Sequence, residues 1–351
     1  MRPPAVLFGI PIADQTMSET IGTVADFVRD GRRRSTTHQV ATVNVDFLVN
    51  ALGDPQLIEI LQNADLCIAD GMPVVWSSRL LGMPLRERVA GSDLLPRLIS
   101  ESETTGWRIH VFGSTPEVAK RASGIITRAH PAASVTIDPG PIIQDPTEID
   151  PAVLDSIAAT DADILCVALG HPKQERFIAA HRDRLGVPVM IGVGGSLDLF
   201  VGERRRAPRW MQRTGLEWLA RAAQEPTRLI PRYAKDLGVF TPAMLREWSR
   251  SRNGHATLGL RAADDDPVLV IELGGLPPTP QVRHEAFHRV SDGASITVTG
   301  EACALDSASF ALLVGLLRAA AHRGVPVLWA DEDVRNSLAA LHVPSARLLD
   351  T

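Results

Sequence analysis

The chain has 351 residues, of which 45% are apolar and 22% are charged, a composition typical of a globular protein. Its length favours two domains, because a single hydrophobic core stops growing at about 250–300 residues. The formal net charge of −5 gives no whole-chain signal for a nucleic-acid partner. No stretch has the roughly 18 consecutive apolar residues of a membrane-spanning helix, and no signal peptide is evident, so we predict a cytoplasmic protein. Three cysteines lie in apolar runs, which predicts buried, reduced thiols.

The first 195 residues alternate between short runs rich in Val and Ile and segments with helical spacing. The runs expected to form strands are 40–45, 66–69, 108–112, 134–137, 164–169 and 187–193. The clearest helices are expected over 116–130, after a Ser-Thr-Pro start signal, and over 172–185, before Gly186. Apolar strands that alternate with helices indicate an α/β fold, a Rossmann-like and mainly parallel sheet with helices on both faces.

Residues 203–250 predict a basic helical appendage with helices over 216–223, 228–237 and 242–249. Between Glu203 and Arg252 twelve basic residues face five acidic ones. Such a patch inside an acidic protein indicates a phosphate-bearing partner or an anionic membrane surface. Three tryptophans are interleaved with it, which fits a membrane interface. A solvated basic face with tryptophans in the core is the alternative.

A second strand–helix pattern follows a short linker at 249–253. Strands are expected at 267–273, 295–298 and 325–329, with an amphipathic helix over 307–322 and a last helix over 332–341. We therefore predict a first domain over residues 1–250, which includes the appendage, and a second, smaller α/β domain over 254–351.

Polar residues follow several of the predicted strands at the point where each strand ends. In open parallel sheets, ligands bind beyond the carboxyl ends of the strands. The segments selected by that rule are 44–46, 70–73, 113–114, 170–175 and 194–198.

Asp70 follows a predicted strand on a turn that contains Gly71. A carboxylate at this position can project into a cleft and act as a general base, or it can cap the helix expected from Pro73. Thr42 and Asn44 lie in and after another predicted strand. They either orient a ligand or form local hydrogen bonds with the backbone at the strand end.

The glycine-rich run Gly192–Gly195 ends a predicted strand. Such a run lets the backbone approach a ligand closely, as phosphate-binding turns require, although tight-turn geometry alone also explains it. Asp161 and Asp163 have the spacing of a metal-binding pair, but they precede a strand and so belong to the amino end of the sheet. With no other metal cluster in the sequence, we predict that neither a metal nor another cofactor is required.

These segments, read in order from about residue 9 to residue 232, resemble the WecG/TagA/CpsF family of glycosyltransferases. The motifs that carry the resemblance are Thr42-Val-Asn44, Asp70-Gly-Met-Pro73, Arg88-Val-Ala-Gly-Ser-Asp93, Gly170-His-Pro-Lys-Gln174-Glu175, Gly192-Val-Gly-Gly195, Arg206-Ala-Pro-Arg-Trp210, Gly215-Leu-Glu-Trp218 and Glu225-Pro-Thr-Arg228. One departure is Asp46, where family members often carry Glu.

The resemblance implies transfer of N-acetylmannosamine, or a related sugar, from a UDP-sugar to a polyprenyl-diphosphate-linked acceptor in cell-envelope or exopolysaccharide synthesis. It places the protein peripherally at the inner face of the plasma membrane, with the basic appendage aiding membrane docking and completing the active site. It implies Asp70 as the base, with Thr42, Asn44 and Arg88 as further catalytic residues. The substrate-binding residues that it implies are Gln174, Gly194, Gly195, Arg221, Arg228 and Arg232.

Physical reasons accompany two of these roles. The fixed fork of donors of Arg88 suits a phosphate, and the amide of Gln174 suits a sugar or uracil, whereas Glu175 is expected to support its helix. Without a metal, arginines would have to stabilise the departing diphosphate. Helical spacing predicts Arg228 and Arg232 on one face, with Arg221 aligned if the helix continues past Pro226.

Residues 267–349 resemble a STAS domain, which implies a regulatory protein partner. Ser307 precedes the long predicted helix, where such domains can be phosphorylated and where the helix dipole favours a phosphate; an ordinary N-cap explains the same residue. An alternative function therefore stays open, a non-catalytic nucleotide-sugar sensor that signals through the STAS-like domain.

Overall fold

The computed structural model describes residues 2, 4–202, 207–208, 211, 216–253, 258–262, 268–273, 286, 289–290, 292–300, 312–317, 320 and 325–329. The chain divides into two compact units. The larger unit consists of Gln15–Val74 and Arg86–Gly238, and the smaller unit of Met1–Asp14, Val75–Leu85 and Val239–Thr351. Each is described by itself below.

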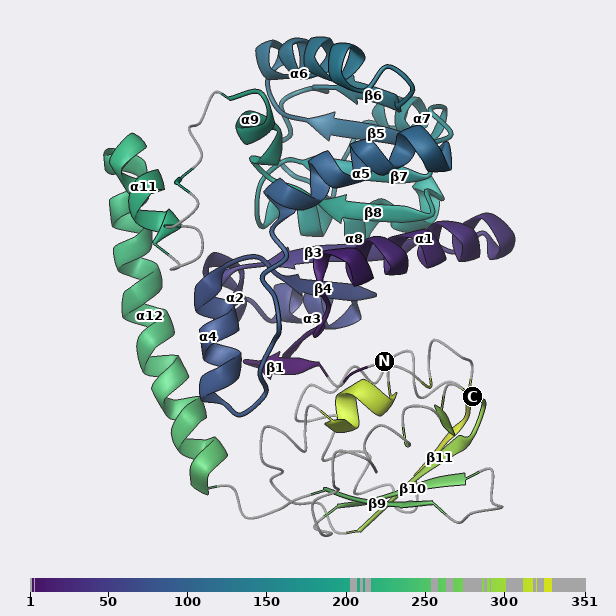
Figure 1. The fold of residues 1–351 in the computed structure, drawn as a ribbon, viewed down its shortest axis with the longest axis vertical. Coiled ribbons are helices and arrows are strands. Elements are labelled where there is room, and N and C mark those ends of the chain that lie inside the picture. Colours follow the sequence, from purple (N-terminus) through teal and green to yellow (C-terminus); the bar gives the residue numbers. More distant parts are fainter. Residues whose placement is uncertain are drawn as a thin grey trace. The chain divides into compact units, whose positions relative to one another are not determined.

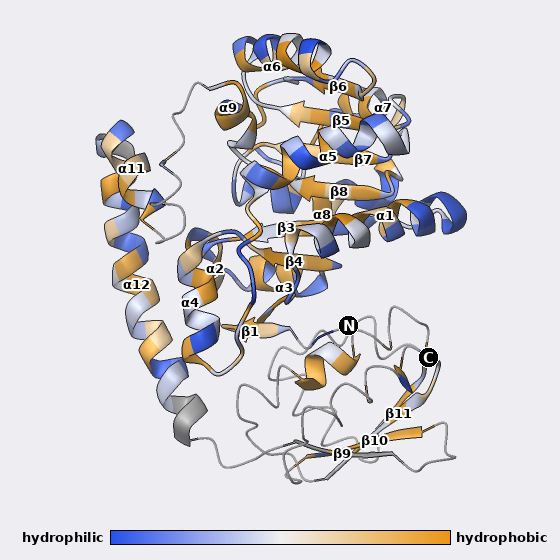
Figure 2. Cartoon of the chain, in the orientation of Figure 1, coloured by the Kyte–Doolittle hydropathy of each residue, from blue (hydrophilic) through white to orange (hydrophobic). Residues whose placement is uncertain are grey.

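A six-stranded parallel sheet forms the centre of the larger unit (Figure 1). Its strand order is β4-β3-β8-β7-β5-β6. The strands are β3 (His38–Val43), β4 (Leu66–Ala69), β5 (Arg108–Gly113), β6 (Ser134–Asp138), β7 (Ile164–Ala168) and β8 (Val189–Gly192). All six lie where the apolar runs predicted them. Figure 2 shows the central strands as mostly hydrophobic, as expected for a sheet with helices packed on it.

Helices precede, connect and follow these strands along the chain, which confirms the predicted Rossmann-like α/β fold. They are α1 (Met17–Arg34), α2 (Val45–Leu52), α3 (Pro55–Asn63), α5 (Gly91–Thr105), α6 (Pro116–Ala129), α7 (Pro151–Ala158), α8 (Lys173–Leu185), α9 (Ser196–Phe200) and α11 (Glu217–Gln224). The start and stop signals act as predicted. The Thr115 hydroxyl accepts a hydrogen bond from the Val118 N–H (3.3 Å) at the start of α6, and α8 ends at Gly186 in the left-handed conformation.

One face of the sheet is closed by α7 and α8. Phe112 of β5 and Phe177 of α8 stack with their ring centroids 5.4 Å apart. Leu154 of α7 and Leu165 of β7 belong to the same buried cluster. Cys166, the neighbour of Leu165, is fully buried, and this burial raises the pKa of its thiol to about 12. Cys67 and Cys166 are both free and buried, as predicted, whereas Cys303 lies outside the described residues.

The smaller unit contains an antiparallel hairpin, β1 (Ala5–Leu7) with β2 (Ile10–Ile12), which was not predicted. It also contains a four-stranded sheet of order β12-β11-β10-β9, in which β10–β12 are parallel and β9 is antiparallel. These strands are β9 (Leu258–Ala262), β10 (Val268–Leu273), β11 (Ser295–Gly300) and β12 (Val327–Trp329). The last three were predicted and β9 was not. The STAS resemblance and the predicted domain boundaries stay predictions, and Ser307 lies outside the described residues.

Two helices, α4 (Met72–Leu80) and α12 (Pro226–Asn253), contribute residues to both units. The α12 helix is continuous, so the predicted break between 237 and 242 was wrong: a helix can include an internal proline at the loss of one backbone hydrogen bond. Within the described part of the chain, no helix has the length and apolarity to cross a membrane.

Candidate functional site

The predicted polar segments meet at the carboxyl edge of the six-stranded sheet. Strand β3 lies between β4 and β8, and β8 lies next to β7. The backbone N–H of Asp70, directly after β4, donates to the carbonyl of Val43 at the end of β3 (2.8 Å). The Thr42 hydroxyl donates to the carbonyl of Gly192 at the end of β8 (3.0 Å). The structure therefore brings the ends of these strands, and the motifs that follow them, to one place.

Asp70 is partly exposed on a turn between β4 and α4. Gly71 has a φ of 146°, a backbone conformation that only glycine adopts without strain. The chain thus leaves the sheet directly after Asp70 and enters α4 at Met72. Its role as a base stays a prediction.

Thr42 and Asn44 form the local hydrogen bonds that were considered as the alternative to ligand binding. The Thr42 side chain is 4% exposed and links β3 to β8 as described above. The Asn44 side chain caps α2 and accepts from the Phe47 N–H (3.3 Å). Both residues therefore shape the sheet edge, and any contact of theirs with a ligand stays a prediction.

Arg88 is held by two carboxylates. Its guanidinium donates to Asp93 of α5 (3.0 Å) and to Glu217 of α11 (3.1 Å), and its side chain is only 14% exposed. Arg88 is thus a structured residue that ties α11 to α5. A role in binding phosphate would require it to share or exchange these partners.

Gln174 is buried under the glycine-rich turn. Its Oε1 accepts from the Gly194 N–H (2.8 Å), and its Nε2 donates to Oε1 of Glu175 (2.7 Å). A Cβ at Gly192 would lie 2.5 Å from Nε2 of Gln174, which explains the glycine there. In this conformation the oxygen and the nitrogen of the Gln174 amide both bond within the protein. Gln174 would therefore affect a ligand by supporting the turn, not by contacting the ligand.

The glycine-rich run forms a tight turn, the alternative explanation given for it, and its close approach to a ligand stays a prediction. Gly194 has a φ of 49°, and Gly195 is the residue before the short helix α9. The backbone N–H of Gly194 is oriented by Gln174, as described above. The turn at the end of β8 is therefore held by the Gln174 side chain.

Sequence reasoning missed a buried pair in the same region. Nδ1 of His171 and Oε2 of Glu175 lie 2.8 Å apart, and their side chains are 6% and 1% exposed. The His171 ring stacks on Phe47 with centroids 3.7 Å apart and an interplanar angle of 18°. The spacing of four residues is the signal that could have indicated the pair, although His171 precedes the helix.

The three predicted arginines are not on one helix. Arg221 belongs to α11, which ends at Gln224, and α12 begins anew at Pro226, so the condition for aligning Arg221 with the other two, a helix that continues past Pro226, is not met. The side chains of Arg221 and Arg228 lie outside the described part of the structure. Arg232 forms a long ion pair with Asp46 of α2 (4.0 Å) and lies over the ring of Tyr233.

Asp236 is a second acidic residue near Asp46. Its side chain is buried on α12, with 5% of the residue exposed. Burial and then the charge of Asp46 raise the pKa of Asp236, whereas Arg232, Lys235 and His171 act in the opposite direction. The first half of α12 therefore adds charged groups to the neighbourhood of α2 and of the turn after β7.

The pair Asp161 and Asp163 is structural, as expected from its position before β7. The Asp163 carboxylate accepts from Arg32 (2.7 Å) and from the Arg108 N–H (2.8 Å). These groups lie at the amino edge of the sheet, opposite the motifs.

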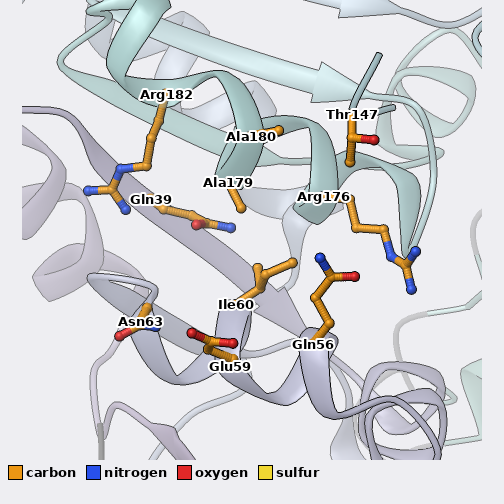
Figure 3. Close-up of a pocket in the computed structure, with 10 residues that line it drawn as sticks. All are labelled: Gln39, Gln56, Glu59, Ile60, Asn63, Thr147, Arg176, Ala179, Ala180 and Arg182. Atoms are coloured by element: carbon orange, nitrogen blue, oxygen red, sulfur yellow. The ribbon is translucent and has the colours of Figure 1, made fainter. Parts of the chain in front are cut away.

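A separate groove of about 310 Å³ lies between α3 and α8 (Figure 3). Its lining residues are Gln39, Gln56, Glu59, Ile60, Asn63, Thr147, Arg176, Ala179, Ala180 and Arg182. Gln39 is near the beginning of β3 and Arg182 is near the end of α8. None of the residues proposed from the motifs lines this groove, so it is distinct from the site at the carboxyl edge.

Comparison with known proteins gives a family match over residues 5–254, to the glycosyl transferase WecG/TagA/CpsF family. The chain is 32% identical over 218 residues, 62% of this chain and 82% of the relative, to the N-acetylglucosaminyldiphosphoundecaprenol N-acetyl-beta-D-mannosaminyltransferase of Bacillus spizizenii strain W23. The protein of the same name from Bacillus subtilis strain 168 is 34% identical over 200 residues, 56% of this chain and 77% of the relative. The one from Staphylococcus aureus strain MW2 is 28% identical over 224 residues, 64% of this chain and 85% of the relative. The family match ends before β9.

Proposed function

The chain belongs to the WecG/TagA/CpsF family of glycosyltransferases, and on that premise we propose that it moves N-acetylmannosamine, or a related sugar, from a UDP-sugar to a polyprenyl-diphosphate-linked acceptor. The observation that carries the proposal is the meeting of the family's motifs at one edge of the sheet, the edge where α/β folds bind ligands. The names of the relatives supply the sugar and the class of acceptor.

The reaction is a displacement at the anomeric carbon of the donor sugar. The acceptor hydroxyl oxygen forms the new bond, the bond from that carbon to the UDP oxygen breaks, and UDP leaves with the bonding electrons. Asp70 takes the proton of the acceptor hydroxyl, a contribution typically worth about 10²–10⁴ in rate. Its place after β4, beside the end of β3, supports this role.

The leaving diphosphate needs positive partners. The backbone N–H of Gly195, together with Arg221, Arg228 and Arg232, is proposed to bind it. Gly194, whose N–H donates to Gln174, is proposed to give the turn the shape that this binding needs. Arg88 is proposed to exchange a carboxylate partner for a phosphate oxygen when substrate binds. These groups would let the reaction proceed without a metal ion.

The first half of α12 is proposed to rest on the membrane that carries the acceptor. Ile230 and Leu237 are 55% and 67% exposed and stand two helical turns apart, so they share one face. Arg232 and Lys235 are exposed as well, and the helical period places them on roughly the opposite side of α12. A helix with an exposed apolar face and basic residues on its other side favours an anionic lipid surface.

Vesicle sedimentation tests the membrane contact. Binding to vesicles that contain anionic lipid is expected to fall in the double variant Ile230→Gln, Leu237→Gln. Ile142 is 96% exposed in the loop between β6 and α7, outside α12. Ile142→Gln is therefore the matched control and should bind as the wild type does. Equal binding by all three proteins would remove the proposed contact.

UDP release by the purified full chain tests the transferase. We expect release from UDP-N-acetylmannosamine that depends on a short-chain polyprenyl-diphosphate-N-acetylglucosamine acceptor and that persists in EDTA. If several UDP-sugars give no release with detergent, lipid and divalent metals supplied, the sensor alternative takes precedence. Release that EDTA abolishes would contradict only the metal independence.

The second domain is proposed to regulate the enzyme through a protein partner, with Ser307 as a phosphorylation site. This proposal rests on the sequence resemblance to STAS domains alone. Comparing the turnover of the wild type with that of Ser307→Asp and Ser307→Ala tests it. Identical turnover of the three proteins, and of the wild type before and after treatment with a kinase, would argue that Ser307 is an ordinary N-cap.

A further inference from the structure

His171 lies at the carboxyl edge of the sheet, in the segment between β7 and α8, and its ring is fixed on two sides. One face stacks on Phe47 with centroids 3.7 Å apart. Nδ1 lies 2.8 Å from Oε2 of Glu175, whose other oxygen accepts from Gln174 (2.7 Å). A carboxylate only accepts hydrogen bonds, so when the ring is neutral its proton lies on Nδ1, toward Glu175, and Nε2 is an acceptor.

Nε2 of His171 is buried, and no group among the described residues forms a hydrogen bond with it. Native proteins pair the great majority of their buried polar atoms, because an unpaired one loses its hydration without compensation. An oriented acceptor that lacks a donor, inside a region built from the family's motifs, therefore calls for a partner that binds there.

His110 provides an internal comparison. Its Nδ1 also has a partner at 2.8 Å, the hydroxyl of Thr136, and its Nε2 is also buried without a partner among the described residues. His110, however, is the third residue of β5, inside the sheet. His171 instead lies at the carboxyl edge of the sheet. Phe47 of α2 stacks on its ring, Glu175 links it to Gln174 and so to the glycine-rich turn, and charged residues of α12 lie nearby.

We propose that His171 is a further substrate-binding residue, whose Nε2 accepts a hydrogen bond from a hydroxyl or an N-acetyl N–H group of a bound sugar. This inference rests on the proposed glycosyl transfer and deepens it. A fixed acceptor rejects ligands that lack a donor at that position, because its own polar atom is then left unpaired. His171 would therefore help to select the sugar, and Glu175 is its positioning residue.

The group that donates the hydrogen bond to Nε2 can belong to either of two sugars, the sugar of the UDP-sugar or the sugar of the polyprenyl-linked substrate. The Michaelis constants for the two substrates, measured separately, distinguish them. His171→Asn keeps an N–H near Nδ1 to bond Glu175 and removes Nε2, so KM for one substrate should rise about 3- to 10-fold, as the loss of one neutral hydrogen bond implies. His171→Gln, which restores a polar amide near the Nε2 position, should recover part of this loss.

His110→Asn is the matched control, because it removes an equally buried Nε2 in the sheet interior and should leave both KM values unchanged. Melting temperatures of the three variants separate binding from folding. If His171→Asn folds and keeps both wild-type KM values, the inference is wrong while the transferase stands. If the wild type itself turns over no sugar, the proposed function fails and His171 loses its role with it.

A contact between His171 and α12 is the competing explanation, since Asp236 of α12 lies close enough for a protonated His171 to lower the pKa of its carboxyl. A double-mutant cycle decides this point. If Asp236→Asn raises the same KM and adds nothing to His171→Asn, then Nε2 serves to hold α12 and the inference is overturned. Additive effects support the contact with the sugar.

Discussion

The two edges of the six-stranded sheet treat acidic residues differently. At the amino edge, Asp163 and Asp65 are buried and matched by donors. Burial alone would raise the pKa of Asp163, but its hydrogen bonds with Arg32 and Arg108 keep that pKa below the ordinary value. The same balance lowers the pKa of Asp65, where His38, Gln39 and Arg182 outweigh burial.

At the carboxyl edge, Asp236 is buried with its pKa raised, first by burial and then by the like charge of Asp46. A protein selected for stability alone would neutralise these acids, as it does at the other edge. Under the proposed function, the contrast is one between a structural edge and a working edge of the same sheet, and five predictions test or sharpen it.

The largest effect is expected from Asp70→Asn at the working edge. Removing the base should lower the rate of sugar transfer about 10²–10⁴-fold, while the nearly identical shape of Asn leaves the melting temperature close to that of the wild type. UDP release and thermal unfolding, measured on one preparation, check both halves. A variant with normal turnover would show that Asp70 is not the base and would return it to the role of a helix cap.

Asp163→Asn should give the reverse pattern. It removes charge-assisted hydrogen bonds from a buried carboxylate, so we expect a loss of about 1.5–3 kcal/mol in the free energy of unfolding and little change in turnover of the folded protein. Urea denaturation measures the loss. A larger fall in activity than in stability would mean that the amino edge also serves catalysis.

The pH dependence of stability follows from the same carboxylate. Because the pKa of Asp163 is lower in the folded state than its ordinary value of 3.8, its contribution is complete above that value and is lost as the pH falls through the folded pKa. The Asp163→Asn variant should therefore lose less stability than the wild type between neutral and acid pH. Parallel acid titrations of the two proteins would contradict this.

A fourth prediction concerns the turn that supports the working edge. In Gly192→Ala the new Cβ would lie 2.5 Å from Nε2 of Gln174 and 2.8 Å from Oε1 of Glu175, so we expect a destabilisation of about 1–3 kcal/mol with reduced turnover. Gly124 in α6 has no atom within 4 Å of such a Cβ. Gly124→Ala is the control and should gain about 0.5–1 kcal/mol. If Gly192→Ala has the stability and the turnover of the wild type, the turn accommodates the new Cβ without cost.

The sheet was predictable mainly because β3, β4, β5, β7 and β8 are almost wholly buried, and such strands are rich in apolar residues, whereas the edge strand β6 is only partly buried. The hairpin β1–β2 was not, since strands of three residues give too short a signal. The meeting of the motifs also followed from the rule for carboxyl ends. The bond from Gln174 to Gly194 and the stacking of His171 on Phe47 depend on side-chain packing between distant segments, which no local pattern encodes.

The smallest effect, and the sharpest test of the contrast, is expected from Asp236→Asn. Since the pKa of Asp236 is raised in the folded state, folding binds its proton more tightly, and the carboxylate costs stability once the pH exceeds the folded pKa. Asp236→Asn should thus stabilise the protein at neutral pH, by less than Asp163→Asn destabilises it, as measured by urea denaturation of both variants. Opposite signs for two buried aspartates of one unit would show that the working edge retains charge at the expense of stability. Equal signs would mean that the edges do not differ in this way and that Asp236 is an ordinary structural acid.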